Sequence, residues 1–247
     1  MMKSIKFRLS GIFNSFRIPL YKNYHKSYIA PPKTALVGFL INIALLLEKD
    51  FFQILSSNAI QVSVIVEELG GQFSDLWSYK TLEDGNRGKN IVKREKNYQV
   101  KYLVYLKIFD EYLREQILTA LRFPKSIPSL GLDDELVHIS DVEEIILGQS
   151  LEAKCDSIFP EAILINGSEN ISFNAFPRKL EKRIILPTIN NVVVNYKNVV
   201  DKKERRTPRQ ADLSINLYEY YNCQIQFEEM PSGIYFDPTS EYHLAFY

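Results

Sequence analysis

Basic and aromatic side chains gather in residues 16–34, immediately before and within the start of a strongly apolar stretch. Cations pair with phosphate groups, aromatic rings stack on unpaired bases, and free N–H groups at the start of a helix attract anions. The combination predicts a binding site for a polyanion. Its candidate contact residues are Phe16, Arg17, Tyr24, His25, Lys26, Lys33 and Thr34.

A second group of the same kind lies in the polar stretch 76–97. Its centre, residues 84–88, reads Asp-Gly-Asn-Arg-Gly and is a turn signal, and the stretch carries six basic residues against three acidic ones. A projecting basic hairpin can follow a phosphate backbone while its rings stack on bases. A solvated loop without a ligand is the alternative. The candidate contact residues are Trp77, Tyr79, Lys80, Arg87, Lys89, Lys93, Arg94 and Lys96.

Charge is distributed unevenly along a chain whose net charge is zero. Residues 1–47 carry seven basic residues and no acidic one, whereas residues 110–161 carry twelve acidic residues against four basic ones. This asymmetry indicates one surface for a polyanion and another that faces water or a protein partner. A third basic cluster, residues 202–209, has five basic residues and one acidic residue. A solvated surface without a partner is the alternative for all three.

The elements that must position these residues follow from hydrophobic periodicity. Alternation predicts strands at residues 5–11, 61–69, 99–109 and 136–146, and a helical period predicts helices at residues 33–48 and 110–123. Pro31-Pro32 and the acidic residues at 110–111 mark the two helix starts. The order β-α-β-β-α-β is typical of an α+β, ferredoxin-like (RRM-like) domain, in which two helices cover one face of a four-stranded antiparallel sheet.

Residues 151–247 are β-rich and contain no predicted helix of useful length. We therefore predict a ferredoxin-like domain at residues 1–150, with a β-hairpin at about 70–98, and a β-rich C-terminal subdomain at residues 151–247. The longest apolar run, residues 35–47, is too short to span a bilayer, and no secretory signal opens the chain. We expect a soluble, cytoplasmic protein. Short C-terminal strands are predicted at residues 162–165, 184–187, 191–196, 214–220, 224–228, 233–236 and 242–246.

Four motifs lie in a fixed order along this pattern. They are Ser15-Phe16-Arg17-Ile18-Pro19, Pro31-Pro32-Lys33-Thr34-Ala35-Leu36-Val37-Gly38-Phe39-Leu40, Val92-Lys93-Arg94-Glu95 and Pro128-Ser129-Leu130-Gly131. Together they resemble the Cas-five family, the RAMP-type subunits of CRISPR type I effector complexes (Cascade), and most closely its I-B-like members. The second motif is the most specific. The elements agree in order across residues 1–150, whereas the last hundred residues match only in β character.

The resemblance implies a subunit that binds and caps the 5′ handle of a crRNA. It also implies contacts to a backbone subunit and to the large subunit, so that the complex targets DNA through its guide. In this family a basic thumb hairpin clamps the RNA, and the hairpin at about 70–98 lies where that thumb would be. Gly131, beside Leu130, would allow a tight turn near the RNA. We expect no membrane partner, cofactor or metal. Phosphate contacts are expected from Arg17, Lys26 and Lys33, and base stacking from Phe16, Tyr24 and His25.

Two alternatives remain open. One branch of the family is a metal-independent endoribonuclease that processes pre-crRNA, and such cleavage needs a general base, a general acid and a cation. His25, with Lys26 and Tyr24 or Tyr28 beside it, is the cluster that could supply them, but that branch's Lys-His pair has no counterpart near Lys107. We therefore expect a non-catalytic subunit. The other alternative is a protein scaffold that binds no RNA and recruits partners through its acidic surface.

Overall fold

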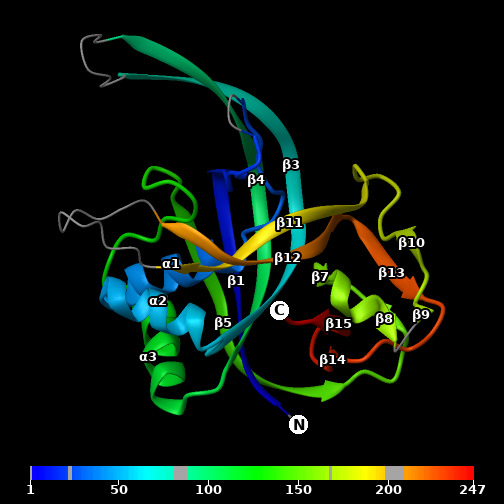
Figure 1. Cartoon of the computed structure of the whole chain (residues 1–247). Helices are drawn as coiled ribbons and strands as arrows, with labels where there is room; N and C mark the ends of the chain where they lie inside the picture. Colours follow the sequence, from blue (N-terminus) through cyan, green and yellow to red (C-terminus); the bar gives the residue numbers. More distant parts are fainter. Residues whose placement is uncertain (1, 22–23, 81–87, 167–168, 198–208) are drawn as a thin grey trace.

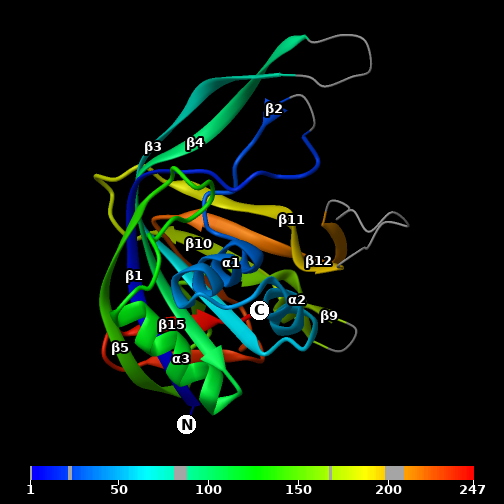
Figure 2. The ribbon, with the colours of Figure 1, turned by 90° about the vertical axis from the view of Figure 1, so that its left-hand side faces the viewer.

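The computed structural model describes residues 2–21, 24–80, 88–166, 169–197 and 209–247. The chain is an α+β protein built mostly of strands, and the first part of it forms one sheet with helices on one face (Figures 1 and 2). The elements of this part are β1 (Met2–Asn14), β2 (Tyr24–His25), α1 (Lys33–Ala44), α2 (Glu48–Ser56), β3 (Ile60–Lys80), β4 (Lys89–Ile108), α3 (Glu111–Arg122) and β5 (Val137–Gln149).

The four long strands lie side by side in the order β5-β1-β4-β3, and each neighbouring pair is antiparallel. The short β2 pairs in parallel with β4. On the far side of β5 the sheet continues with β14 (Ile234–Asp237) and β15 (Tyr242–Ala245). The main core fills the space between the sheet and the helices, where Phe7, Leu36, Val64, Leu106 and Leu121 are all buried.

The local sequence explains where the helices begin and end. The Asp110 side chain caps α3 by accepting a hydrogen bond from the Leu113 N–H at 2.6 Å. The helix predicted at 33–48 is shorter, because Leu45 adopts the left-handed conformation (φ 55°) and ends α1. A second helix, α2, was missed. It starts where Asp50 accepts a hydrogen bond from the Leu47 N–H.

Strands β3 and β4 are twice as long as the alternation predicted. Their ladder continues beyond the core to the pair Lys80↔Lys89, and it forms a hairpin that projects from the body (Figure 1). The lower half is held by buried β-branched residues such as Val62 and Val64. The upper half has mostly exposed side chains, which is why hydrophobic periodicity found only the base.

The C-terminal part is built of short and medium-length strands. Its elements are β6 (Lys154–Cys155), β7 (Phe159–Pro160), η1 (Glu161–Leu164), β8 (Ile165–Asn166), β9 (Glu169–Asn170), β10 (Phe173–Pro177), β11 (Ile185–Lys197), β12 (Gln210–Tyr221) and β13 (Cys223–Phe227). They form two further three-stranded sheets, ordered β10-β13-β6 and β11-β12-β7. The predicted strands 184–187 and 191–196 are one strand, β11, and residues 161–164 form a 3-10 turn where a strand was predicted.

These later elements share the core of the first part. Strand β11 contacts α1 and α2, and Val192, Leu217 and Tyr221 belong to the same buried cluster as the helices. The two cysteines are free and buried. None of the described helices combines the length and apolarity needed to cross a membrane.

Candidate nucleic-acid interface

A cavity of about 370 Å³ lies at the base of the projecting hairpin. It receives side chains from both basic segments that the sequence singled out, residues 16–34 and 76–97, although residues 35–75 separate them in the chain. The helix α1 presents its first turn to the same cavity, through Thr34 and Ala35. Eight predicted contact residues line it: Phe16, Arg17, His25, Lys26, Thr34, Trp77, Arg94 and Gly131.

The loop between β1 and α1 is folded back on itself. The Ile18 N–H donates to the Lys26 carbonyl at 2.8 Å, and the Tyr28 N–H donates to the Phe16 carbonyl at 2.9 Å. Further along, β2 pairs with residues 93–94 of β4. The loop is therefore pinned against the base of the hairpin, and this carries Arg17 and Lys26 to the cavity.

Glu95 fastens this loop to β4. Its carboxylate accepts hydrogen bonds from the Tyr24 hydroxyl at 2.8 Å and from the Ser27 N–H at 3.3 Å. The bond to Glu95 is the largest cause of the raised pKa of Tyr24. The ammonium of Lys93 lies 5.7 Å from the centre of the Tyr24 ring. Tyr24 is thus held by its hydroxyl, with one cation close to its ring.

Arg94 and Trp77 form the hairpin side of the cavity. The guanidinium lies 4.8 Å from the centre of the indole and bonds Asp75 at 2.9 Å, while its Nε has no partner among the described residues. Trp77 is 47% exposed and Tyr79 is 37% exposed, with 5.9 Å between their ring centres. Two neighbouring exposed rings beside a cation are suited to stacking of unpaired bases.

His25 lies among cations. Burial lowers its pKa below 6.5, and the charges of Arg17 and Arg94 lower it further. This environment favours the neutral imidazole, a ring that offers a hydrogen bond. Among the predicted residues, Arg17, Lys26 and Arg94 bring positive charge to the cavity.

Of three further predicted residues, only Gly131 lines the cavity, whereas Lys96 and Leu130 are buried outside its lining. Lys96 is buried and lies 3.2 Å from the buried Glu135, which also accepts hydrogen bonds from Ser15 through its N–H (2.7 Å) and its hydroxyl (2.6 Å). Leu130 is fully buried, and Gly131 has a φ of +109°. Sequence reasoning missed Glu135, because the charge alone does not reveal its burial.

Other predicted residues are buried or lie away from the cavity. Lys33 is buried and donates to Asn58 Oδ1, and burial lowers its pKa to about 8; it lines a separate cavity of about 560 Å³. Phe16 is only 3% exposed and packs on Tyr102, with 6.1 Å between ring centres. Lys80 is exposed far along the hairpin, where its backbone pairs with that of Lys89. Arg87 lies outside the described residues.

A family model described as CRISPR-associated protein (Cas_Cas5) matches residues 4–217. The chain belongs to this family. The subtype within the Cas_Cas5 family stays a prediction. None of the curated proteins matches the chain.

Solved structures with low sequence identity match this Cas_Cas5 chain over most of its length. A chain of a "CRISPR RNA-guided surveillance complex" is 16% identical, with 93% of this chain and 91% of that chain covered and a TM-score of 0.47. A CRISPR protein from Archaeoglobus fulgidus is 12% identical, with 98% of each chain covered and a TM-score of 0.48. A chain of a type III-B Cmr-beta complex bound to cognate target RNA and AMPPnP is 8% identical, with 91% and 86% covered and a TM-score of 0.41.

The Cas_Cas5 chain also brings two residues to the cavity that sequence reasoning did not select. Tyr196 lies in β11, and Arg209 is the residue just before β12. Arg209 belongs to the basic cluster 202–209, whose residues 202–208 lie outside the described residues. Its guanidinium lies 4.6 Å from the centre of the Phe51 ring on α2. The basic charge of residues 202–209 could have indicated Arg209 as a contact residue, but nothing in the sequence indicated that it lies near residues 16–34.

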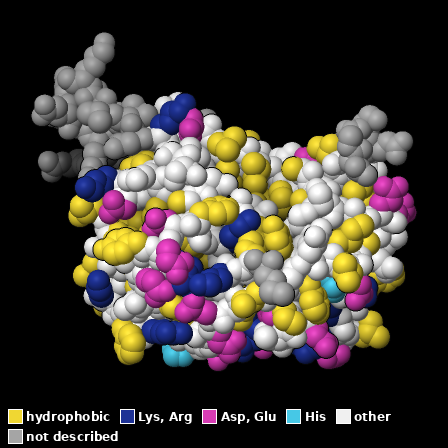
Figure 3. All heavy atoms as spheres, turned by 90° about the horizontal axis from the view of Figure 1, so that it is seen from below, with side chains coloured by type: hydrophobic (Ala, Val, Ile, Leu, Met, Phe, Trp, Pro, Cys, Tyr) yellow, Lys and Arg dark blue, Asp and Glu magenta, His cyan; other side chains and the backbone are white. Residues whose placement is uncertain are grey.

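The acidic region 110–161 of this family member is partly neutralised within the fold. The buried Arg114 pairs with Glu111, Glu115 and Glu144. Seen from below, acidic and basic side chains are interleaved on the surface of the molecule (Figure 3). The pairing of Arg114 therefore offsets part of the negative charge that a simple count gives residues 110–161.

Proposed function

We propose that this protein binds and caps the 5′ handle of a crRNA as a subunit of a type I CRISPR effector complex (Cascade). Membership of the Cas_Cas5 family supports a role in a CRISPR effector complex. The observation that carries the proposal is the cavity at the hairpin base, where Arg17, Lys26 and Arg94 meet the exposed ring of Trp77. Cations and free ring faces together match single-stranded RNA.

The proposed mechanism is physical and non-catalytic. Arg17 and Lys26 hold handle phosphates, and the first turn of α1, which lines the cavity at Thr34, adds the positive end of its dipole. Trp77 and Tyr79 stack on splayed bases, while the ring of His25 offers a hydrogen bond. The hairpin of β3 and β4 closes over the RNA as a thumb.

The proposal also includes the fold class of the protein and its place in the complex. The four long strands in the order β5-β1-β4-β3, joined through α1–α2 and α3, support assignment to the ferredoxin-like (RAMP) class. As a cap, the subunit would link the first backbone subunit to the large subunit in the cytoplasm, and so support DNA targeting by the complex. The division into residues 1–150 and 151–247 also remains a proposal.

RNA affinity measured against salt tests the proposal. We expect the purified protein to bind a 5′-handle RNA, and each of Arg17→Ala and Lys26→Ala to reduce the slope of log affinity against log salt by about 0.7. Lys49→Ala, an exposed lysine on α2 away from the cavity, is the matched control and should leave the slope unchanged. Absence of RNA binding at low salt would refute the proposal and favour the scaffold alternative.

One observation favours the endoribonuclease alternative: His25 lines the cavity among cations, and burial together with these charges lowers its pKa. A general base needs the neutral imidazole that a lowered pKa favours. Incubation of the protein with pre-crRNA in EDTA decides between binding and cleavage. We expect intact RNA; specific cleavage that disappears in His25→Ala would overturn the non-catalytic assignment.

A further inference from the structure

The face of the sheet opposite the helices carries an exposed aromatic cluster at the base of the hairpin. Phe13, Phe73 and Tyr98 come from the adjacent strands β1, β3 and β4, with ring centres 5.2, 5.7 and 6.4 Å apart. Their side chains are 41%, 37% and 37% exposed, so each offers a free surface. They line a shallow pocket of about 300 Å³ together with Gly71 and Gln72.

The neighbours of these rings indicate that the cluster lies on the face of the sheet away from the main core. Asn14 donates to the Leu130 carbonyl at 2.5 Å, and Asn97 donates to the Tyr28 carbonyl at 2.8 Å, so both side chains point to the main core, to which Leu130 and Tyr28 belong. Phe13 and Tyr98 are the exposed neighbours of these buried residues in paired strands. The left-handed Gln99 (φ 47°) interrupts the alternation of β4 between Tyr98 and the core residue Val100.

A groove with excess positive charge lies next to the cluster, because its lining includes Ile12, Gly70 and Gln99, the sequence neighbours of residues at the rings. Two cavities, of about 670 and 1260 Å³, share Glu68, Lys101 and Lys182 and together cross β1, β3 and β4. Lys101 lies between Val100 and Tyr102, whose side chains are in the core on the helix side, so Lys101 faces the groove.

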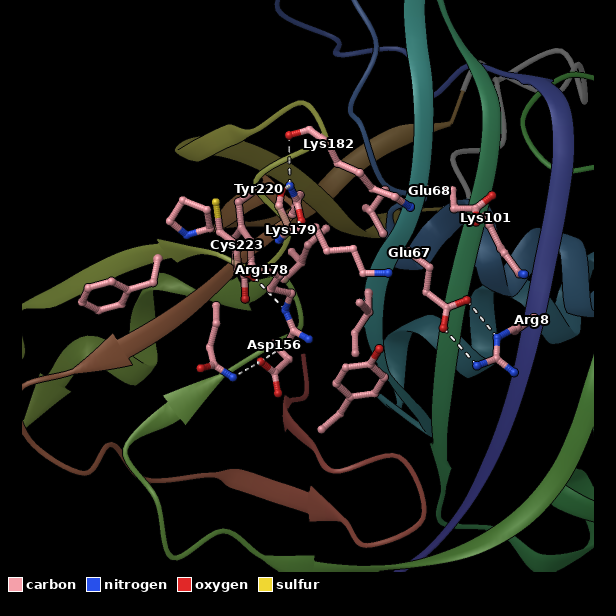
Figure 4. A pocket seen from close by; sticks show the side chains of 18 residues that line it. Arg8, Glu67, Glu68, Lys101, Asp156, Arg178, Lys179, Lys182, Tyr220 and Cys223 are labelled. Atoms are coloured by element: carbon pink, nitrogen blue, oxygen red, sulfur yellow. Dashed lines mark hydrogen bonds and ion pairs between the residues drawn. The ribbon is translucent and has the colours of Figure 1, made fainter.

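Pairing within the groove leaves a surplus of cations. Arg8 is bound to Glu67 and Arg178 to Asp156, as the dashed lines in Figure 4 show. Among the described residues, no salt bridge involves the remaining four cations, and only Glu68 opposes them on the groove walls. The four are Lys101, Lys179, Lys182 and Arg183.

We propose that this face is a second binding surface for single-stranded RNA, on which bases stack on Phe13, Phe73 and Tyr98 while phosphates follow the cations of the groove. The pairing of a cationic groove with rings on adjacent strands is the combination that single-stranded nucleic acid requires. This inference rests on the proposed function, because the RNA that occupies the cavity would continue around the upper part of β3. Lower down, Val62 of β3 exchanges backbone hydrogen bonds with Tyr247 and Val64 accepts one from Ile158, so the RNA would pass above that region.

Binding of RNA of two lengths tests the inference. The probes are fluorescent single strands of about 6 and about 16 nucleotides that begin with the same handle sequence, and a DNA strand of the longer sequence. We expect Phe73→Ala combined with Tyr98→Ala to weaken binding of the longer RNA at least about tenfold and to leave the shorter RNA unchanged. Tyr112→Ala, an exposed ring on α3, is the matched control and should change neither.

A charge variant controls for misfolding of the Phe73→Ala and Tyr98→Ala variant. Lys182 and Arg183 lie in the irregular segment before β11, and neither belongs to a described ion pair. The combined variant Lys182→Ala and Arg183→Ala should also weaken binding of the longer RNA only. If neither variant affects the longer RNA while Arg17→Ala weakens both, the second surface is wrong and the proposed function stands. If Arg17→Ala affects neither RNA, the proposed function fails. If the ring substitutions weaken binding of the DNA strand as much as binding of the longer RNA, the assignment to RNA is wrong. It is also wrong if they abolish binding of a protein partner and leave RNA binding intact.

Discussion

Gly131 occupies a position in the cavity wall that only a residue without a side chain can fill. Its φ of +109° is outside the range of other residues, and an added Cβ would collide with Glu135 Oε2 and lie 2.7 Å from the Ser15 carbonyl oxygen. We expect Gly131→Ala to lower the free energy of unfolding by about 2 kcal/mol or more. The midpoint of urea denaturation measures this.

Gly38 in α1 provides the matched control for that substitution. A Cβ there would meet only Phe51 Cε2 at 3.9 Å, which is an ordinary contact, and the backbone is helical. Gly38→Ala should therefore raise the free energy of unfolding by about 0.5–1 kcal/mol. Equal effects of the two substitutions would contradict the role given to the turn at Gly131.

The hairpin of β3 and β4 can be shortened without entering the core. Trp77 pairs with Val92, and beyond this pair nearly all described side chains are exposed. If residues 78–91 are replaced by Asn-Gly, we expect an unchanged unfolding midpoint. The salt dependence of RNA binding should weaken by about 2 in slope, because three cations are removed at about 0.7 each.

A full-length hairpin with altered charge separates the two contributions of this element. Lys80→Gln combined with Lys89→Gln keeps the ladder but removes two of its cations. If the salt slope falls by about 1.4 while stacking-dependent affinity remains, the cations act on phosphates. If the shortened protein binds the handle RNA as tightly as the full-length chain at every salt concentration, the thumb assignment is wrong.

Glu219 joins the C-terminal strands to the loop that forms the cavity. From β12 it accepts hydrogen bonds from the Ala30 N–H at 3.3 Å and from Asn190 at 2.6 Å, and burial raises its pKa to about 7. The folded chain therefore binds a proton that the unfolded chain releases above pH about 4.5. Stability should fall as pH rises from about 4.5 to 7, and fall no further above that from this group.

The isosteric Glu219→Gln substitution reports this contribution directly. Glutamine keeps an acceptor for Ala30 but cannot ionise, so the variant should lose the decline between pH 4.5 and 7 that the original chain shows. Denaturation curves of both proteins across this range give the difference. Parallel pH dependences would show that Glu219 is not the titrating group.

Much of the fold was predictable from local patterns. The strands at 5–11 and 136–146 and the helix at 110–123 were placed correctly because burial on one face imposes a period on the sequence. The break between α1 and α2 was missed because Leu45 has no sequence signal for a left-handed conformation. The upper hairpin was predicted from its turn and charges alone, because its strands bury little.

By itself, the sequence determined which chemistry was available: cations at Arg17 and Lys26, rings at Trp77 and Tyr79, and family membership through short motifs. Only the tertiary structure decided which way each side chain points. Lys96 turns inward because Glu135, 39 residues away, offers it a buried carboxylate, and Arg209 reaches the cavity because β11 and β12 cross the helices. Such partners are distant in sequence, and their meeting depends on the packing of the whole chain, which no local pattern encodes.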